Sequence, residues 1–461
     1  MKITLHDACP ENTIQVVFDT ASTGTSRVER DGKIYLSLGI ESNTPLTRRR
    51  TMGLMRRMVA EARERKMHRI AMDVASLPDV PCKRADTLRL FGENAHMANY
   101  EFVAYKKGKN VSDRPFLDEL ALVGVFTKEE KHALRFGEVV AGETNAARDL
   151  ANMPGGDMTP ALLAQRIKKS AQGTKAVVRV LGVAEMKRLK MGAILGVGRG
   201  AKEAPRFIIV EYYGAGKSVA PVVLVGKGVT FDTGGLSLKL ADSMLDMHLD
   251  MSGGAAVAHA VIAAARLGLQ VNAIALVPAA ENAIGHESYR PGDVLTSMSG
   301  KTIDILNTDA EGRVLLADAL TYAKRYKPSL LVDVATLTGA ALVTFGTKAS
   351  AVMSKDDELS WRFHTLGETS GDYCWPLPLW DEYKEMIKGR FGDIANVPIG
   401  NARYAGTIGG GMFLAEFVEG PWVHIDMAPR MTSDKSDHLA DGAAGAPVRL
   451  LVRLLEEEQV R

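Results

Sequence analysis

The sequence predicts an α/β protein of two domains: a smaller N-terminal α/β domain and a larger C-terminal α/β domain with a central mixed, mostly parallel sheet. Its 461 residues exceed the usual size of one compact unit. Strand and helix patterns alternate in the first part of the chain. In the second part, short apolar runs are each followed by a glycine- or acid-rich loop, as in the central strands of a parallel sheet.

The N-terminal domain is predicted to span residues 1–126. Period-two alternation and amphipathic helical patterns follow one another along it. The expected strands are 13–18, 33–38 and 69–74, and the expected helices are 47–66 and 83–100. The segment KKGKNVSDRP, residues 106–115, is polar and rich in turn-forming residues, so we expect a surface loop there.

A connecting helix and linker are predicted over residues 127–158. The helical pattern runs from 127 to 152 and stops at the breaker Pro154-Gly155-Gly156. Thr159 is a suitable N-cap, and Pro160 a suitable first residue, for the helix that follows. This helix opens the C-terminal domain, which is predicted to span residues 159–461.

Short apolar segments in the C-terminal domain are typical of buried strands. The expected strands are 221–225, 272–277, 330–334 and 422–427, and a closing helix is expected at 447–460. Because parallel strands end at a common edge of a sheet, the loops that follow them gather there. We therefore expect the functional site at this edge.

The composition gives no sign of a nucleic-acid-binding or membrane protein. The net charge is +2 and the hydrophobic fraction is 46%, both ordinary for a globular protein. The basic residues within 47–66 are expected to form a solvated helix face. The sequence holds no run of about 18 apolar residues, the length that a membrane-spanning helix needs.

Cysteine usage favours a reducing compartment. Cys9, Cys82 and Cys374 are far apart and have no zinc-binding spacing, so we expect reduced thiols. The opening MKITLHDACPEN holds acids and a proline where a signal peptide needs an apolar core. We therefore expect a cytoplasmic protein.

Three segments of the C-terminal domain carry candidate chemistry: VGKGVTFDTGGLSLKL (225–240), MHLDMSGG (247–254) and NTDAEGRVLLAD (307–318). Asp232 follows a buried strand, and Asp309 and Glu311 precede a helix. Carboxylates gathered at one sheet edge repel one another unless cations join them. Several carboxylates that bridge suit a pair of divalent metals about 3.5–4 Å apart.

Two simpler interpretations stay open on spacing alone. Asp309 and Glu311 also suit a helix N-terminus, where acids are favoured. Asp242, Asp246 and Asp250 recur every four residues, as on one solvated helix face.

Motifs that would indicate other kinds of binding site or active site are incomplete or absent. Lys227 lies in Gly-Lys-Gly, but the phosphate-loop pattern GxxxxGK[ST] is absent. Gly196, Gly198 and Ala201 match GxGxxA, yet a strand is expected after them where dinucleotide binding needs a helix. Neither HExxH nor GxSxG occurs. Three nearby histidines are expected to serve packing: His248, His259 and His424.

The motif Asn307-Thr308-Asp309-Ala310-Glu311-Gly312-Arg313 resembles the signature of the leucyl aminopeptidase family, also called the cytosol aminopeptidases or M17 peptidases. VGKGVTFDTGG, DMSGGAAV, VDVATLTGA, WPLPLW and HIDMA are similar to that family in the same order. The resemblance is strong over about residues 140–461 and weaker before them. Because several long motifs occur in the same order as in the family, the resemblance is highly specific.

The resemblance implies a role for each matching residue. Asp232 and Glu311 would bridge two metals, Asp309 would complete one metal, and Lys227 with Asp250 would complete the other. The implied catalytic side chains that hold no metal are Lys239 and Arg313. The implied substrate pocket consists of Met247, Thr336, Gly339, Ala428 and Met431, which suit a leucine- or methionine-sized side chain.

The resemblance further implies hydrolysis of the N-terminal peptide bond by metal-activated water, with Lys239 stabilising the oxyanion. The cofactors would be two divalent metal ions, zinc or manganese, and a bicarbonate held by Arg313. The expected partners are peptide substrates and further copies of the chain in a homohexamer, with no membrane. DNA binding as a main role, a phosphatase using a similar metal pair, and a non-catalytic metal-binding protein are the competing hypotheses.

The sequence departs from the family pattern at a few positions. Val314 replaces the usual leucine after the arginine, and Leu240 replaces the usual proline after Lys239. Pro429-Arg430 stands where a glycine is usual, at the rim of the implied pocket. No implied metal ligand is lost, so we expect an active enzyme.

Overall fold

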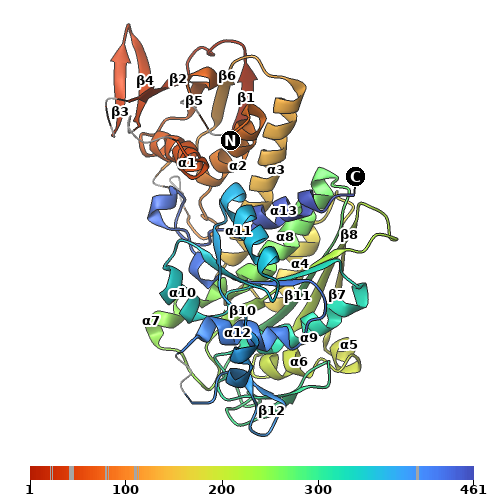
Figure 1. The fold of residues 1–461 in the computed structure, drawn as a ribbon. Coiled ribbons are helices and arrows are strands. Elements are labelled where there is room, and N and C mark those ends of the chain that lie inside the picture. The colour runs from red at the N-terminus through yellow and green to blue at the C-terminus, as the bar shows by residue number, and fades with distance from the viewer. Residues whose placement is uncertain are drawn as a thin grey trace. The chain divides into compact units, whose positions relative to one another are not determined.

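The structure is a computed structural model that describes residues 1–461 except 21, 23, 41–45, 78, 79, 81, 108–111, 113, 401–403 and 461. The chain divides into two compact units (Figure 1). Unit 1 comprises residues 1–145 and 433–442, and unit 2 comprises residues 146–432 and 443–461. The boundary falls inside helix α3 (Lys128–Ala151). The domain limits at 126 and 159 stay a prediction.

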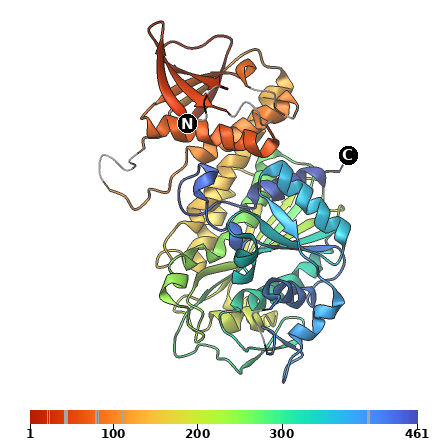
Figure 2. The ribbon, with the colours of Figure 1, turned by 60° about the vertical axis from the view of Figure 1, so that its left-hand side comes forward.

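Unit 1 is built on a six-stranded sheet in the order β1-β6-β5-β2-β4-β3. The pairings are parallel except for that of β3 with β4. Helices α1 and α2 contact each other on one side of this sheet (Figures 1 and 2). The elements are β1 (Lys2–His6), β2 (Ile14–Asp19), β3 (Thr25–Arg30), β4 (Lys33–Gly39), α1 (Arg48–Glu64), β5 (Arg69–Asp73), η1 (Val74–Ser76), α2 (Arg84–Ala98), β6 (Glu119–Val123) and η6 (Lys435–Asp437).

Local capping explains where the helices start. Thr47 accepts a hydrogen bond from the backbone N–H of Arg50, at the start predicted for α1. Thr127 and Glu130 bond each other's backbone N–H at the start of α3, which is a capping box. Thr159 caps the helix that begins at Pro160, as predicted. The loop expected at 106–115 lies partly outside the described residues.

Unit 2 is built on a nine-stranded sheet in the order β16-β15-β18-β14-β9-β11-β8-β7, with β10 paired to β11. The central pairings, β18 with β14, β14 with β9, and β9 with β11, are parallel, whereas β8 runs antiparallel to both neighbours. The strands of this sheet are β7 (Val177–Leu181), β8 (Arg206–Tyr213), β9 (Val222–Gly226), β10 (Gly228–Asp232), β11 (Asn272–Asn282), β14 (Leu330–Ala335), β15 (Ser350–Met353), β16 (Cys374–Pro376) and β18 (Trp422–Asp426). A separate small sheet has the order β12-β13-β17, with β12 (Val294–Thr296), β13 (Thr302–Asp304) and β17 (Ile394–Ala395). The predicted α/β class with a mixed, mostly parallel sheet is confirmed.

Helices pack on both faces of this sheet. Val223, Val225, Ile274 and Leu276 share one hydrophobic cluster with residues of α6, α9 and α12. Helix α8 also contacts β9 and β11 but contributes no residue to that cluster, so it covers the other face (Figure 1). The helices are α4 (Pro160–Ser170), α5 (Val183–Arg188), α6 (Gly192–Gly198), α7 (Ala241–Met244), α8 (Ser252–Leu267), α9 (Glu311–Ala323), α10 (Gly339–Phe345), α11 (Asp357–Ser370), α12 (Gly406–Ala415) and α13 (Val448–Glu457), with short 3-10 turns η2 (Met247–Met251), η3 (Lys324–Tyr326), η4 (Asp381–Ile387) and η5 (Ala428–Arg430).

Strand β11 is longer than predicted. The expected strand, 272–277, ended before Pro278, a residue that lacks a backbone N–H. The observed strand continues to Asn282, because its second half pairs with β10 through Ala279 and Ala280. This extension brings Asn282 to the sheet edge where β10 ends. Among the described helices, none is long and apolar enough to cross a membrane.

Candidate metal centre

The carboxyl ends of the central strands of unit 2 carry most of the predicted site. Lys227 directly follows β9, and Asp232 is the last residue of β10. Asp250 lies in η2, immediately before α8, and Glu311 is the first residue of α9. All four side chains are buried, with exposed fractions of 1–3%. The sequence predicted that these side chains gather at this edge of the sheet, and the structure places them there.

The ammonium group of Lys227 lies among acids. Its Nζ is 2.8 Å from both Asp250 oxygens and 2.8 Å from Glu311 Oε1. It also donates to the backbone carbonyl of Thr336 at 2.9 Å. The hydroxyl of Thr336 in turn donates to Asp250 Oδ1 at 2.7 Å. Lys227, Asp250 and Glu311 therefore form one side of a compact polar cluster.

Lys239 forms the other side of the cluster. Its Nζ lies 2.9 Å from Asp232 Oδ2 and 2.5 Å from Asp309 Oδ1. Asp232, Asp309 and Glu311 each offer an oxygen within 4.8 Å of the other two. The structure thus gathers all five predicted metal ligands, together with Lys239, at one place.

The electrostatics of the cluster indicate a deficit of positive charge. Burial raises the pKa of Asp250 to about 6 and that of Glu311 to about 8, with nearby Asp232 adding to both shifts. Burial alone lowers the pKa of the Lys227 ammonium, but the carboxylates of Asp250, Glu311 and Asp232 outweigh it, so this pKa is raised. The two lysines serve as counter-charges for four acids. The donor set, four carboxylates and an amine that are buried and convergent, fits a pair of divalent cations.

Gly312 allows Lys227 to reach the acids. A Cβ at position 312 would lie 2.6 Å from Lys227 Cε and 2.9 Å from its Nζ, far inside normal contact distance. Any larger residue at the start of α9 would push the amine away from Glu311. The glycine of the Asp-Ala-Glu-Gly-Arg motif is therefore required by the close approach of the lysine.

Arg313 lies beside the cluster with little solvent contact. Its exposed fraction is 6%, and burial lowers the pKa of its guanidinium to about 10. Its buried Nε has no hydrogen-bond partner in the described part of the chain. A buried cation with an unmet donor is a favourable place for a bound anion.

The predicted pocket residues lie on segments that adjoin the cluster. Thr336 is bonded to Asp250 and is buried, whereas Met247, Ala428 and Met431 are half-buried and Gly339 is exposed. Helix α10, which begins at Gly339, contacts η5, which begins at Ala428. Met247 opens η2, two residues before the buried pair Leu249 and Asp250.

Two polar residues that hold the site together were missed by the sequence reasoning. Asp426 accepts hydrogen bonds from the backbone N–H groups of Leu337 and Ala428 and from the hydroxyl of Thr338. It thereby joins the segments that carry the predicted pocket. Asn282 donates to Asp232 Oδ1 and to the carbonyl of Thr308. Both residues lie at the end of a buried strand. For Asp426 this position is a signal that the sequence carries, because a strand was predicted at 422–427, whereas the strand that ends at Asn282 was predicted to stop at residue 277.

The simpler interpretations of the acids explain only part of their positions: Glu311 does lie in the first turn of α9, where acids are favoured, but it does not cap that helix. Helix α9 has Ala310 at its N-cap without a side-chain capping bond, and Glu311 is buried. Asp242 and Asp246 are exposed but Asp250 is buried; Asp242 lies on α7, whereas Asp246 is the N-cap of η2 and Asp250 lies within it, so the three do not share one helix face. His424 is fully buried and pairs with Asp333 at 2.6 Å, which fits the packing role expected of it.

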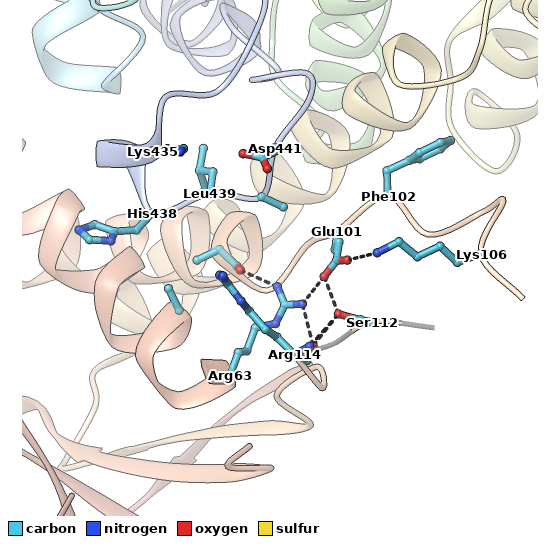
Figure 3. A pocket seen from close by; sticks show the side chains of 13 residues that line it. Arg63, Glu101, Phe102, Lys106, Ser112, Arg114, Lys435, His438, Leu439 and Asp441 are labelled. Carbon is cyan, nitrogen blue, oxygen red and sulfur yellow. Dashed lines mark hydrogen bonds and ion pairs between the residues drawn. The ribbon is translucent and has the colours of Figure 1, made fainter. Parts of the chain in front are cut away.

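A cavity of about 760 Å³ lies in unit 1, among residues of α1, α2 and the segment 433–442 (Figure 3). Within it Arg63 donates to Glu101 at 2.9 Å, and Lys106 donates to the same carboxylate at 3.0 Å. None of the residues predicted for the site lines this cavity. Convergent acids, and not cavity size, therefore identify the candidate site.

Comparison with known proteins agrees with this geometry and with the motif resemblance. The model of the cytosol aminopeptidase family, catalytic domain, matches residues 145–452. Probable cytosol aminopeptidases of Roseiflexus castenholzii and Syntrophotalea carbinolica are 41% and 42% identical, over 92% and 88% of this chain and 86% and 83% of theirs. The bottromycin maturation enzyme BotP in complex with Mn has a TM-score of 0.84 at 30% identity, with 99% of both chains covered. The chain therefore belongs to the cytosol aminopeptidase family and is a metal-dependent aminopeptidase.

Proposed function

We propose that the protein is a dinuclear leucyl aminopeptidase that removes leucine-like or other apolar residues from the free N-terminus of peptides. The observation that carries this proposal is the convergence of Asp232, Asp309 and Glu311, whose oxygens lie within 4.8 Å of one another beside Lys227 and Asp250. A cluster this acidic and this buried is costly without cations.

In this proposal Asp232 and Glu311 are shared by two metals, Asp309 completes one of them, and Lys227 with Asp250 completes the other. To act as a ligand, Lys227 would have to be uncharged, and a metal–nitrogen bond would replace the ion pairs that its ammonium makes with Asp250 and Glu311. The bound metals supply Lewis acidity and a nucleophile from water near neutral pH. Zinc and manganese are both proposed, and the manganese complex of BotP supports the second.

Lys239 is proposed to act as a cation and not as a ligand. Its Nζ pairs with Asp232 and Asp309, whereas Lys227 pairs with Asp250 and Glu311. The neighbouring carboxylates raise the pKa of Lys239 despite its partial burial. It therefore keeps its proton at neutral pH. From this position it donates a hydrogen bond to the substrate carbonyl oxygen as negative charge develops there.

Arg313 is proposed to bind bicarbonate. Its buried Nε, unpartnered in the described part of the chain, supports an anion at this place. A bicarbonate there supplies a base for the proton that water loses. Arg313 fixes that base next to the acidic cluster without adding another carboxylate to it.

Substrate selection is proposed to depend on Met247, Thr336, Gly339, Ala428 and Met431. These side chains are small or flexible, so an aliphatic side chain of leucine size fits among them better than a charged one. The exposed Gly339 has nothing within 4 Å of a Cβ built on it, which leaves room for a substrate side chain.

The proposal also includes a homohexamer in the cytoplasm, supported by family membership alone. DNA binding and membrane binding are not part of it. Sedimentation of the purified protein tests the assembly, since six copies of a 49.8 kDa chain separate readily from one or two.

The test is a substrate panel combined with metal analysis. Metal-stripped protein is assayed on leucine, lysine and glutamate p-nitroanilides and on p-nitrophenyl phosphate, before and after Mn²⁺ or Zn²⁺ is added. We expect metal-dependent release from the leucine substrate, little from the charged ones, and two ions per chain. Phosphate ester hydrolysis alone, or one ion per chain at full activity, contradicts the proposal.

A further inference from the structure

We propose that Asn282 is a positioning residue of the metal centre. Its side-chain amide holds Asp232 so that a single carboxylate oxygen, Oδ2, faces the position of the metals. The inference rests on the metal site of the proposed function and adds a residue that acts through a ligand without being one.

The sheet register places Asn282 beside Asp232. Strands β10 and β11 are parallel, with Val229 opposite Ala280 and Asp232 opposite Asn282. Three steps along β10 therefore match two steps along β11, which is a bulge. Bulges near active sites re-aim side chains. Here the bulge brings the last residues of the two strands into register, and both are fully or almost fully buried.

Two neutral donors occupy one oxygen of Asp232. Asn282 Nδ2 donates to Asp232 Oδ1 at 2.7 Å, and the backbone N–H of Gly234 donates to the same oxygen at 2.8 Å. The other oxygen, Oδ2, lies 2.9 Å from Lys239 Nζ. An oxygen that already accepts two N–H bonds is a poor metal ligand, so Oδ2 is the ligand atom.

The same amide ties two ligand-bearing segments together. Asn282 Nδ2 also donates to the carbonyl of Thr308 at 3.0 Å, in the turn that carries Asp309. Both partners of Nδ2 are acceptors, so the reversed amide would set oxygen against oxygen. The chemistry of the partners therefore fixes the orientation of the side chain.

The oxygen atom of the Asn282 amide makes no contribution to the hydrogen bonds that hold the fold. Asn282 Oδ1 is buried and has no hydrogen-bond partner among the described residues. Gly235, with a φ of +61°, passes so close that a Cβ there would lie 3.0 Å from that oxygen. An unmet buried acceptor is unfavourable for stability. This cost is expected where the amide serves to orient a ligand and not to stabilise the sheet.

Asn272, at the other end of β11, is a matched control. It is equally buried, but both ends of its amide are satisfied: Nδ2 donates to the carbonyls of Gly216 and Val219, and Oδ1 accepts from the N–H of Ala215. These contacts hold a surface turn far along the strand from the cluster. Loss of Asn272 therefore affects stability without touching the metal ligands.

The experiment compares metal-stripped wild type, Asn282→Leu, Asn282→Ser and Asn272→Leu. Each is titrated calorimetrically with Mn²⁺, melted without metal, and loaded with Co²⁺ for its visible absorption spectrum, which reports ligand geometry. We expect both Asn282 variants to bind Mn²⁺ about 10–100-fold more weakly, the range found for residues that orient metal ligands, and to change the Co²⁺ spectrum. We expect Asn272→Leu to melt earlier with wild-type affinity and spectrum.

Wild-type affinity and an unchanged Co²⁺ spectrum in the Asn282 variants overturn the inference, as does an equal loss of affinity in Asn272→Leu. Should Asn282→Leu fail to fold, Asn282→Ser, whose smaller side chain fits the same space, decides by the same titration. If the wild type binds two Mn²⁺ and the Asn282 variants bind them with the same affinity, only the role of Asn282 is overturned. A wild type that binds no metal sinks the proposed function as well.

Discussion

Ser237 and Thr308 bond each other twice: the backbone N–H of Ser237 donates to Thr308 Oγ1 at 2.8 Å, and the backbone N–H of Thr308 donates to Ser237 Oγ at 3.1 Å. The hydroxyl of Thr308 also donates to the carbonyl of Gly234 at 2.7 Å. This pair joins the loop that ends at Lys239 to the turn that carries Asp309 and Glu311. The proposed catalytic lysine and two of the proposed ligands are therefore positioned by one set of bonds.

Removal of this link is expected to slow catalysis. Thr308→Val keeps the shape of the side chain but leaves the N–H of Ser237 and the carbonyl of Gly234 unpaired. The cost is about 1–3 kcal/mol for the buried carbonyl and less for the half-buried N–H. We expect a lower melting temperature and about a 10-fold lower kcat, with KM little changed, because the loop carrying Lys239 loosens. Thr321→Val, which removes a hydroxyl bond to Ala317 within α9, is the control and should keep wild-type kcat. Equal kcat in the two variants contradicts the role of the link.

Loss of the Lys239 ammonium is expected to separate metal binding from turnover. Lys239→Ala removes the proposed oxyanion donor and no proposed ligand, so we expect two metals per chain and about a 100- to 1,000-fold lower kcat. Lys324→Ala removes a surface lysine paired with Glu419 and should behave as wild type. A Lys239→Ala enzyme with near wild-type kcat would remove Lys239 from the mechanism.

A blocked N-terminus is expected to abolish cleavage. In the proposed function the free α-amine of the substrate is recognised at the acidic cluster, and acetylation removes both its basicity and its charge. We expect hydrolysis of leucyl-glycyl-glycine and none of its N-acetyl form, measured by mass spectrometry at equal substrate concentration. Comparable rates on both peptides are incompatible with recognition of the free α-amine of the substrate.

Asp318 is expected to make stability depend on pH. It is buried on α9 and accepts backbone N–H bonds from Ile194 and Met298, and burial raises its pKa from 3.8 to about 7. The folded state then binds more protons than the unfolded state between about pH 4 and 7. The contribution of this group to stability is therefore full below pH 4 and is lost as the pH rises to 7.

The matched comparison is Asp318→Asn, which stays neutral at every pH. The difference in melting temperature between wild type and Asp318→Asn should shift in favour of the variant as the pH is raised from 4.5 to 7.5, at saturating metal. Taking the difference between the two melting temperatures removes the pH dependence of all titratable groups that the two proteins share. A difference that is constant over this range shows that Asp318 does not titrate there.

The sequence predicted the elements whose patterns agree with their environment. The strand at 222–226 is apolar and buried on both faces, and Thr159-Pro160 starts a helix by local bonds alone. Helix α12 was not predicted, because its sequence GTIGGGMFLA holds four glycines, which have low helix propensity. Tertiary packing overrides that propensity, since Met412, Phe413 and Leu414 are fully buried.

The sequence predicted some residues of the candidate site and missed others. Asp232, Asp309 and Glu311 were recognised by their position after strands and by their motifs. Asn282 was not, because its role depends on the bulge between β10 and β11, and a register shift between strands distant in sequence leaves no local signal. The Nε of Arg313, which has no hydrogen-bond partner among the residues that the structure describes, is also a property of the packed structure and not of the motif that contains it.

The most direct test of the metal centre is anomalous diffraction from crystals soaked in Mn²⁺. The account predicts two peaks of similar height about 3.5–4 Å apart, bounded by Lys227, Asp232, Asp250, Asp309 and Glu311, with Lys239 outside both coordination spheres. A single peak, or peaks that leave Lys227 still paired with Asp250 and Glu311, would contradict it.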